Sequence, residues 1–71
     1  MKEIKIIGQS VELYKVLKFE AIAASGGEAK SIIADGNVKV NDALELRKRR
    51  KLVVGDTFEV FGEHYRLTGD T

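Results

Sequence analysis

The sequence predicts an α+β domain in which two short helices pack on a small, mostly antiparallel sheet. Apolar residues recur at helical spacing only between about residues 11 and 36, and they alternate with polar residues on either side of that stretch. The 71 residues leave room for one core, so we expect residues 1–71 to form a single domain. With 44% hydrophobic and 32% charged residues, the composition is that of a globular protein.

The first elements are predicted to be a strand and a helix. Ile4 and Ile6 alternate with a lysine, which indicates a half-buried strand ending at Gly8. Ser10 is expected to cap a helix that begins near Val11. The apolar face of this helix is expected at positions i, i+4 and i+8, which are Leu13, Leu17 and Ala21.

A second helix is predicted to begin at a capping box and to end at a glycine. Ser25 and Glu28 have the spacing at which each side chain can accept from the other residue's backbone amide. Gly36 follows the last apolar residue, where a left-handed conformation ends a helix at little cost. The buried face is expected to consist of Ala29, Ile32 and Ile33, with Lys30 exposed.

After Gly36 the hydrophobic period becomes alternating, which predicts several short strands. Asn41-Asp42, Gly55-Asp56 and Gly62-Glu63 are the turn signals between these strands. The core-facing residues are expected to be Val38, Val40, Leu44, Leu46, Leu52, Phe58, Val60, Tyr65 and Leu67. We interpret the aromatic residues mostly as core, although Phe19 and Phe61 are out of register with their neighbours.

Five consecutive cations, Arg47, Lys48, Arg49, Arg50 and Lys51, form what we call the basic segment. They are five of twelve basic residues, and the rest of the chain holds seven basic against eleven acidic residues. Arginine binds phosphate at two points, so the segment predicts a phosphate-rich partner. Exposed like charges support little structure, so their removal is expected to cost the fold little.

Three other residues are candidates for the same binding site. Lys30 and Lys39 are expected to flank the basic segment, and Asn41 can bond a ribose hydroxyl or a base edge, or else only hold its turn. The alternative function is a protein-interaction module that docks on an acidic partner through the same patch.

The sequence offers no catalytic constellation. There is no cysteine, His64 is the only histidine and is expected to be exposed, and the acidic residues are scattered. We therefore expect no enzyme activity, no metal and no cofactor. The longest apolar run is four residues, Ala21 to Ala24, so we expect no membrane association and a cytoplasmic location.

Thirteen spaced residues also form a combined pattern of two helices, a hairpin and a late turn. They are Leu13, Leu17, Ser25, Ala29, Ile33, Gly36, Val38, Val40, Asn41, Gly55, Asp56, Phe58 and Val60. This pattern resembles the RNA-binding domain named after the fourth small-subunit ribosomal protein, the S-four domain. The short length, the leading strand and the R-K-R-R-K-L segment look most like the stand-alone YaaA/YbcJ subfamily.

The resemblance implies the alpha-L RNA-binding motif and binding to structured RNA, with ribosomal RNA as the leading candidate. It also implies ribosomal or assembly proteins as possible neighbours and a role in ribosome assembly. The chain departs from the family pattern where Gly26 replaces an arginine, Glu28 a frequently basic residue and Asp42 a glycine. These departures shift the expected RNA contacts toward the basic segment.

Overall fold

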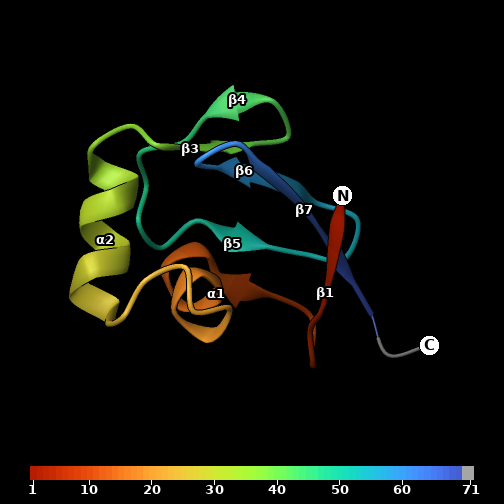
Figure 1. Cartoon of the computed structure of the whole chain (residues 1–71). Coiled ribbons are helices and arrows are strands. Elements are labelled where there is room, and N and C mark those ends of the chain that lie inside the picture. Colours follow the sequence, from red (N-terminus) through yellow and green to blue (C-terminus); the bar gives the residue numbers. More distant parts are fainter. Residues whose placement is uncertain (70–71) are drawn as a thin grey trace.

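The computed structural model describes residues 1–69 as a five-stranded sheet with two helices on one face and a separate two-stranded ribbon (Figure 1). The elements are β1 (Lys2–Lys5), β2 (Val11–Glu12), α1 (Leu13–Phe19), α2 (Gly26–Ala34), β3 (Val38–Val40), β4 (Ala43–Leu44), β5 (Lys51–Leu52), β6 (Thr57–Val60) and β7 (Glu63–Thr68). The sheet order is β1-β7-β6-β3-β4, and β2 pairs with β5. Only β1 and β7 run parallel, which confirms the predicted α+β class.

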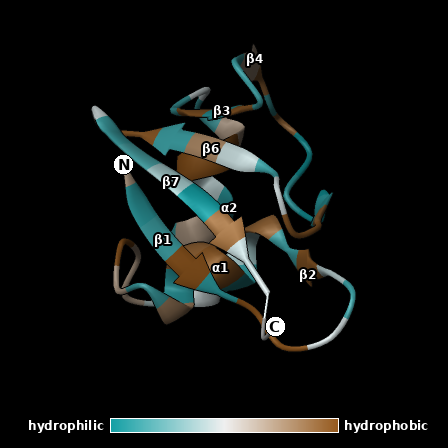
Figure 2. Ribbon diagram, turned by 90° about the vertical axis from the view of Figure 1, so that its right-hand side faces the viewer, coloured by the Kyte–Doolittle hydropathy of each residue, from teal (hydrophilic) through white to brown (hydrophobic). Residues whose placement is uncertain are grey.

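One hydrophobic core lies between the sheet and the two helices. Figure 2 shows the helices behind the sheet, and the buried apolar residues of both layers form one cluster. Stacked rings of Phe58 and Tyr65, with centroids 4.8 Å apart, join β6 to β7. The predicted core residues that the structure buries are Ile4, Ile6, Leu13, Leu17, Ala29, Ile32, Ile33, Val38, Val40, Leu52, Phe58, Val60, Tyr65 and Leu67.

The first helix begins later than predicted, and the prediction for Ser10 is wrong. Residues 11 and 12 are extended because they pair with residues 51 and 52 of β5. Glu12 is the N-cap residue and makes no side-chain cap, so Ser10 lies outside the helix. Ala21 is also outside it and exposed, with a φ of 59°, because α1 ends at Phe19.

The second helix confirms its prediction at both ends. The amide of Glu28 donates to the Ser25 hydroxyl oxygen at 3.1 Å, which is the expected capping bond. Gly36 has a φ of 82°, and its amide donates to the Ile33 carbonyl at 3.1 Å. Lys30 is half-buried rather than exposed.

The strand after the first hairpin faces the opposite way from the prediction. Asn41 and Asp42 both have positive φ, which makes a two-residue turn and places Leu44 opposite the exposed Lys39. Side chains opposite each other share a face, so Leu44 is exposed and Glu45 lies on the buried side with Val38. The expectation that Leu44 and Leu46 continue the core is therefore wrong, since they are 59% and 53% exposed.

Two aromatic residues are also outside the core. Phe19, at the end of α1, is 68% exposed, and Phe61 is 64% exposed. The turn between β6 and β7 contains Phe61 and Gly62, both at positive φ, one residue earlier than the predicted Gly62-Glu63 turn. Both side chains that were out of register in the sequence therefore lie on the surface.

Candidate nucleic-acid interface

The basic segment forms a turn that leads into β5 beside the start of α1 (Figure 1). The amide of Arg50 donates to the Arg47 carbonyl at 3.3 Å and closes the turn. The amide of Leu13 donates to the Arg50 carbonyl at 2.9 Å, and the amide of Tyr14 donates to the Lys48 carbonyl at 3.1 Å. These carbonyls satisfy helix amides that a capping side chain would otherwise satisfy, so the backbone of the basic segment is fixed against α1.

Two of the five cations are bound to a buried carboxylate, that of Glu45, whose side chain is only 6% exposed. Its Oε2 accepts from the Arg47 amide at 2.9 Å and from Arg47 Nε at 3.0 Å. Its Oε1 accepts from Arg47 Nη2 at 3.1 Å and from Arg50 Nη1 at 2.6 Å. We call Glu45, Arg47 and Arg50 the Glu45 clamp.

The clamp holds Glu45 in its charged form. The side-chain hydrogen bonds from Arg47 are the main reason that the pKa of Glu45 falls from 4.5 to about 2, and burial opposes this change. The same pairing raises the pKa of Arg47. Because they bind this buried carboxylate, we predict that Arg47 and Arg50 support the fold, in contrast to the expectation that removing any of the five cations costs the fold little.

A second group of cations surrounds the half-buried ring of Tyr14 in α1. Lys30 Nζ lies 4.8 Å, Arg49 Cζ 5.6 Å and Lys15 Nζ 6.0 Å from the ring centroid. At these distances each cation is attracted to the electron-rich ring. We call Tyr14, Lys15, Lys30 and Arg49 the Tyr14 cluster, and it joins α1, α2 and the basic segment on one surface.

One carboxylate lies beside the Tyr14 cluster. Glu12 is 3.2 Å from Lys15 Nζ and 3.8 Å from Arg49 Nη1. Lys48 and Lys51 are exposed, and neither forms an ion pair within the part of the chain that the structure describes. On this surface, the cations outside the Glu45 clamp are therefore Lys48 and Lys51 together with those of the Tyr14 cluster.

The structure separates Lys39 and Asn41 from this surface. Lys39 lies opposite Leu44 and Glu59 on the face of the sheet away from the helices. The side chain of Asn41 donates to Asp56 at 3.1 Å and accepts from the Thr57 amide at 3.0 Å. These bonds support the turn-holding role that the sequence left open for Asn41, and the RNA contact suggested for it stays a prediction.

The sequence reasoning missed three residues of this region. It did not use Tyr14 or Lys15 for binding, because their proximity to Lys30 and Arg49 depends on how α1 and α2 pack. It also missed the burial of Glu45. The two-residue turn at Asn41-Asp42 was a usable signal for Glu45, because it fixes which side of the following strand faces the core.

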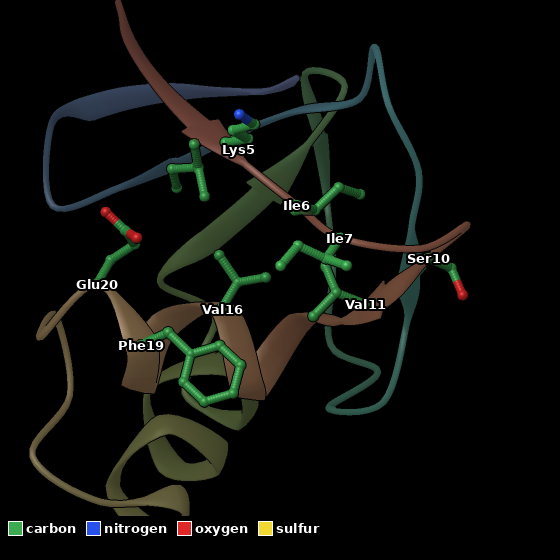
Figure 3. A pocket seen from close by; sticks show the side chains of 9 residues that line it. Lys5, Ile6, Ile7, Ser10, Val11, Val16, Phe19 and Glu20 are labelled. Carbon is green, nitrogen blue, oxygen red and sulfur yellow. The ribbon is translucent and has the colours of Figure 1, made fainter. Parts of the chain in front are cut away.

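An apolar groove lies elsewhere, between the end of β1 and α1 (Figure 3). It has a volume of about 270 Å³ and is lined mainly by isoleucine, valine and Phe19 side chains, with Lys5, Ser10 and Glu20 as its polar members.

His64 is exposed in β7 and lies 3.8 Å from Glu59. No group of three histidine or acidic residues within residues 1–69 is arranged to hold a metal ion. Neither α1 nor α2 is long and apolar enough to span a membrane.

The fold and the basic surface define a small α+β module with an exposed cationic face. Residues 4–68 match the model of the S4 domain, so the chain belongs to the S4 domain family. YbcJ of Escherichia coli (strain K12) is 50% identical to it over 57 residues, which are 80% of this chain and 81% of YbcJ. The protein named "Probable ribosome maturation protein RlbA" of Bacillus subtilis (strain 168) is 39% identical over 59 residues, 83% of each chain.

Two solved structures share the fold. The solution structure of Escherichia coli YbcJ, described as revealing an αL motif involved in RNA binding, superposes with a TM-score of 0.72 at 39% identity. That match covers 96% of this chain and 87% of YbcJ. The crystal structure of ribosomal protein S4e from Thermoplasma acidophilum gives a TM-score of 0.70 at 32% identity, covering 83% of this chain and 31% of S4e. The YbcJ structure confirms the predicted alpha-L architecture.

Proposed function

We propose that this chain is a non-catalytic RNA-binding protein that binds structured RNA, with ribosomal RNA as the target. The observation that carries the proposal is the convergence of Lys30 and Arg49 on the Tyr14 ring, with the exposed Lys48 next to Arg49 in a turn whose backbone is bonded to Tyr14. Cations from separate segments on one folded surface match the closely spaced phosphates of a nucleic acid. The names of YbcJ and RlbA support an RNA partner and a role connected with the ribosome.

The departure at Gly26 also fits this proposal. A Cβ atom at Gly26 would lie 3.7 Å from Tyr14 Cε2, so the position where the S-four pattern has arginine adjoins the Tyr14 cluster. Arg49 brings a guanidinium to the same ring from the basic segment. The cation missing from α2 is thus replaced by one from another part of the chain.

The test is binding to a short RNA hairpin, measured by fluorescence anisotropy over a range of salt concentrations. With three or four phosphate contacts, log K is expected to fall with log salt at a slope of about −2 to −4. The double variant Lys48→Gln, Arg49→Gln removes two cations that are not in the Glu45 clamp, so its slope becomes shallower by about 1.5.

The double variant Lys39→Gln, Arg66→Gln is the matched control, because it removes two positive charges from the far face of the sheet. It is expected to bind with nearly the wild-type affinity and slope, and circular dichroism checks that every variant is folded. Wild-type binding by the folded Lys48→Gln, Arg49→Gln variant would refute the proposed surface. Absence of hairpin binding by the wild type at low salt would refute RNA binding and favour docking on an acidic protein.

The ribosomal part of the proposal has its own test. The tagged chain is expected to sediment with ribosomal particles from a cell lysate, and the Lys48→Gln, Arg49→Gln variant to remain at the top of the gradient. Sedimentation that does not respond to this variant would point to a protein contact. The cytoplasmic location and the single-domain organisation of residues 1–71 remain predictions within this proposal.

A further inference from the structure

Glu45 joins both ends of the turn that carries Lys48 and Arg49. At the start of the turn it accepts from the backbone amide of Arg47 at 2.9 Å, and at the end it accepts from Arg50 Nη1 at 2.6 Å. With the Nε and Nη2 bonds of Arg47, four hydrogen bonds converge on its two oxygens. A buried carboxylate is costly unless it is satisfied in this way, so the side chain is held in one position.

The turn is held from a second direction by α1. The Lys48 carbonyl accepts from the Tyr14 amide, and the Arg50 carbonyl accepts from the Leu13 amide. The Glu45 clamp and these two bonds leave the backbone between residues 47 and 50 little freedom, although the side chain of Arg49 is 66% exposed. Lys48 and Arg49 therefore extend from a backbone that is fixed beside Tyr14.

We propose that Glu45 is a positioning residue for RNA binding, which holds Lys48 and Arg49 in the conformation that a structured RNA requires before the RNA arrives. This inference rests on the proposed function. Glu45 touches no RNA in this scheme and acts only through Arg47 and Arg50. Its effect is greatest for folded RNA, whose phosphates are fixed in space, and smallest for an unpaired strand, which adapts to either arrangement of the turn.

Simple electrostatics predicts the opposite effect for the same residue. A negative charge beside an RNA site repels phosphate, and Glu45 also offsets one of the two positive charges of Arg47 and Arg50. Replacing Glu45 by glutamine without any loss of positioning would therefore tighten RNA binding and steepen its salt dependence. A weaker RNA affinity of the Glu45→Gln variant therefore indicates positioning, and a stronger affinity indicates an effect of charge.

The experiment compares wild type with Glu45→Gln on two probes, a short RNA hairpin and an oligouridine strand of the same length. Loss of a preformed arrangement of two long side chains is expected to weaken hairpin binding about three- to tenfold. Oligouridine binding is expected to stay the same or to increase. Glu63→Gln is the control for charge, because Glu63 is exposed and pairs with Lys2 on β1.

Arg47→Lys provides a second test that preserves net charge and applies even if Glu45→Gln does not fold. Lysine cannot supply the paired donors of the guanidinium, so the hairpin affinity is expected to fall while oligouridine affinity is kept. Faster hydrogen exchange of the Tyr14 amide in either variant would show directly that the turn has loosened.

Three outcomes overturn the inference. The first is a hairpin affinity of folded Glu45→Gln that equals or exceeds that of Glu63→Gln, which shows that Glu45 affects RNA binding only through its charge. Equal losses for hairpin and oligouridine show general damage to the fold rather than positioning. If wild type binds neither probe, the proposed function itself fails, and the inference fails with it.

Discussion

Replacing Arg50 is predicted to destabilise the fold, whereas replacing its neighbour Arg49 is not. Arg50 Nη1 lies 2.6 Å from Oε1 of Glu45, and the two side chains are 30% and 6% exposed. Arg50→Gln weakens a charge-assisted bond to a buried carboxylate, although Arg47 still binds Glu45. We expect the free energy of unfolding to fall by about 1.5 to 3 kcal/mol.

Arg49→Gln removes the same charge from the next residue. Its ion pair with Glu12 is 3.8 Å long, and the arginine side chain is 66% exposed, so the expected cost is below about 0.5 kcal/mol. For a domain of this size, 1 kcal/mol corresponds to about 4–8 °C in Tm, so the two variants are separable by thermal unfolding. Urea denaturation gives the two free energies directly. Equal unfolding free energies for the two variants would refute the assignment of Arg50 to the fold and of Arg49 to the surface.

Two further predictions concern pH and packing. Because the folded-state pKa of Glu45 is about 2, below the ordinary 4.5, its stabilisation is complete above pH 4.5 and is lost as the pH falls through 2. The contribution is about 1–2 kcal/mol after allowing for solvent near the clamp, and a Glu45→Gln variant with unchanged acid sensitivity in urea titrations would contradict it. Ile33→Ala is expected to cost about 2–5 kcal/mol because Ile33 is fully buried, whereas Leu46→Ala is expected to cost less than about 0.5 kcal/mol. Similar Tm values for these two variants would contradict the assignment of Ile33 to the core and of Leu46 to the surface.

The sequence determined the features of this protein that depend on local chemistry. The Ser25 cap and the end of α2 at Gly36 follow from hydrogen bonds and backbone conformation within a few residues. The burial of every second strand residue, such as Val38, Phe58 and Leu67, follows from the alternating hydrophobic period. The basic segment is likewise visible as a run of adjacent charges. These features are sufficient for the fold class and for a phosphate-rich partner, and the resemblance to the S-four pattern made RNA the leading candidate.

The start of α1 was decided by tertiary pairing. Ser10 has the right chemistry for a cap, but β5 pairs with residues 11 and 12 and keeps them extended. The carbonyls of the basic segment then satisfy the first amides of the helix. Sequence reasoning fails here because the partner strand is about 40 residues away along the chain.

The division of the five cations was also decided by the tertiary structure. In the sequence they are equivalent, but the turn at Asn41-Asp42 places Glu45 on the buried side, where it binds Arg47 and Arg50. Packing of α1 against α2 places Lys30 beside the Tyr14 ring, and the backbone bonds between α1 and the turn of the basic segment place Arg49 beside the same ring. Alternation along β3 leaves Lys39 on the far face of the sheet. Charge is a property of each residue, but whether a charge supports the fold or faces a ligand depends on its neighbours in space.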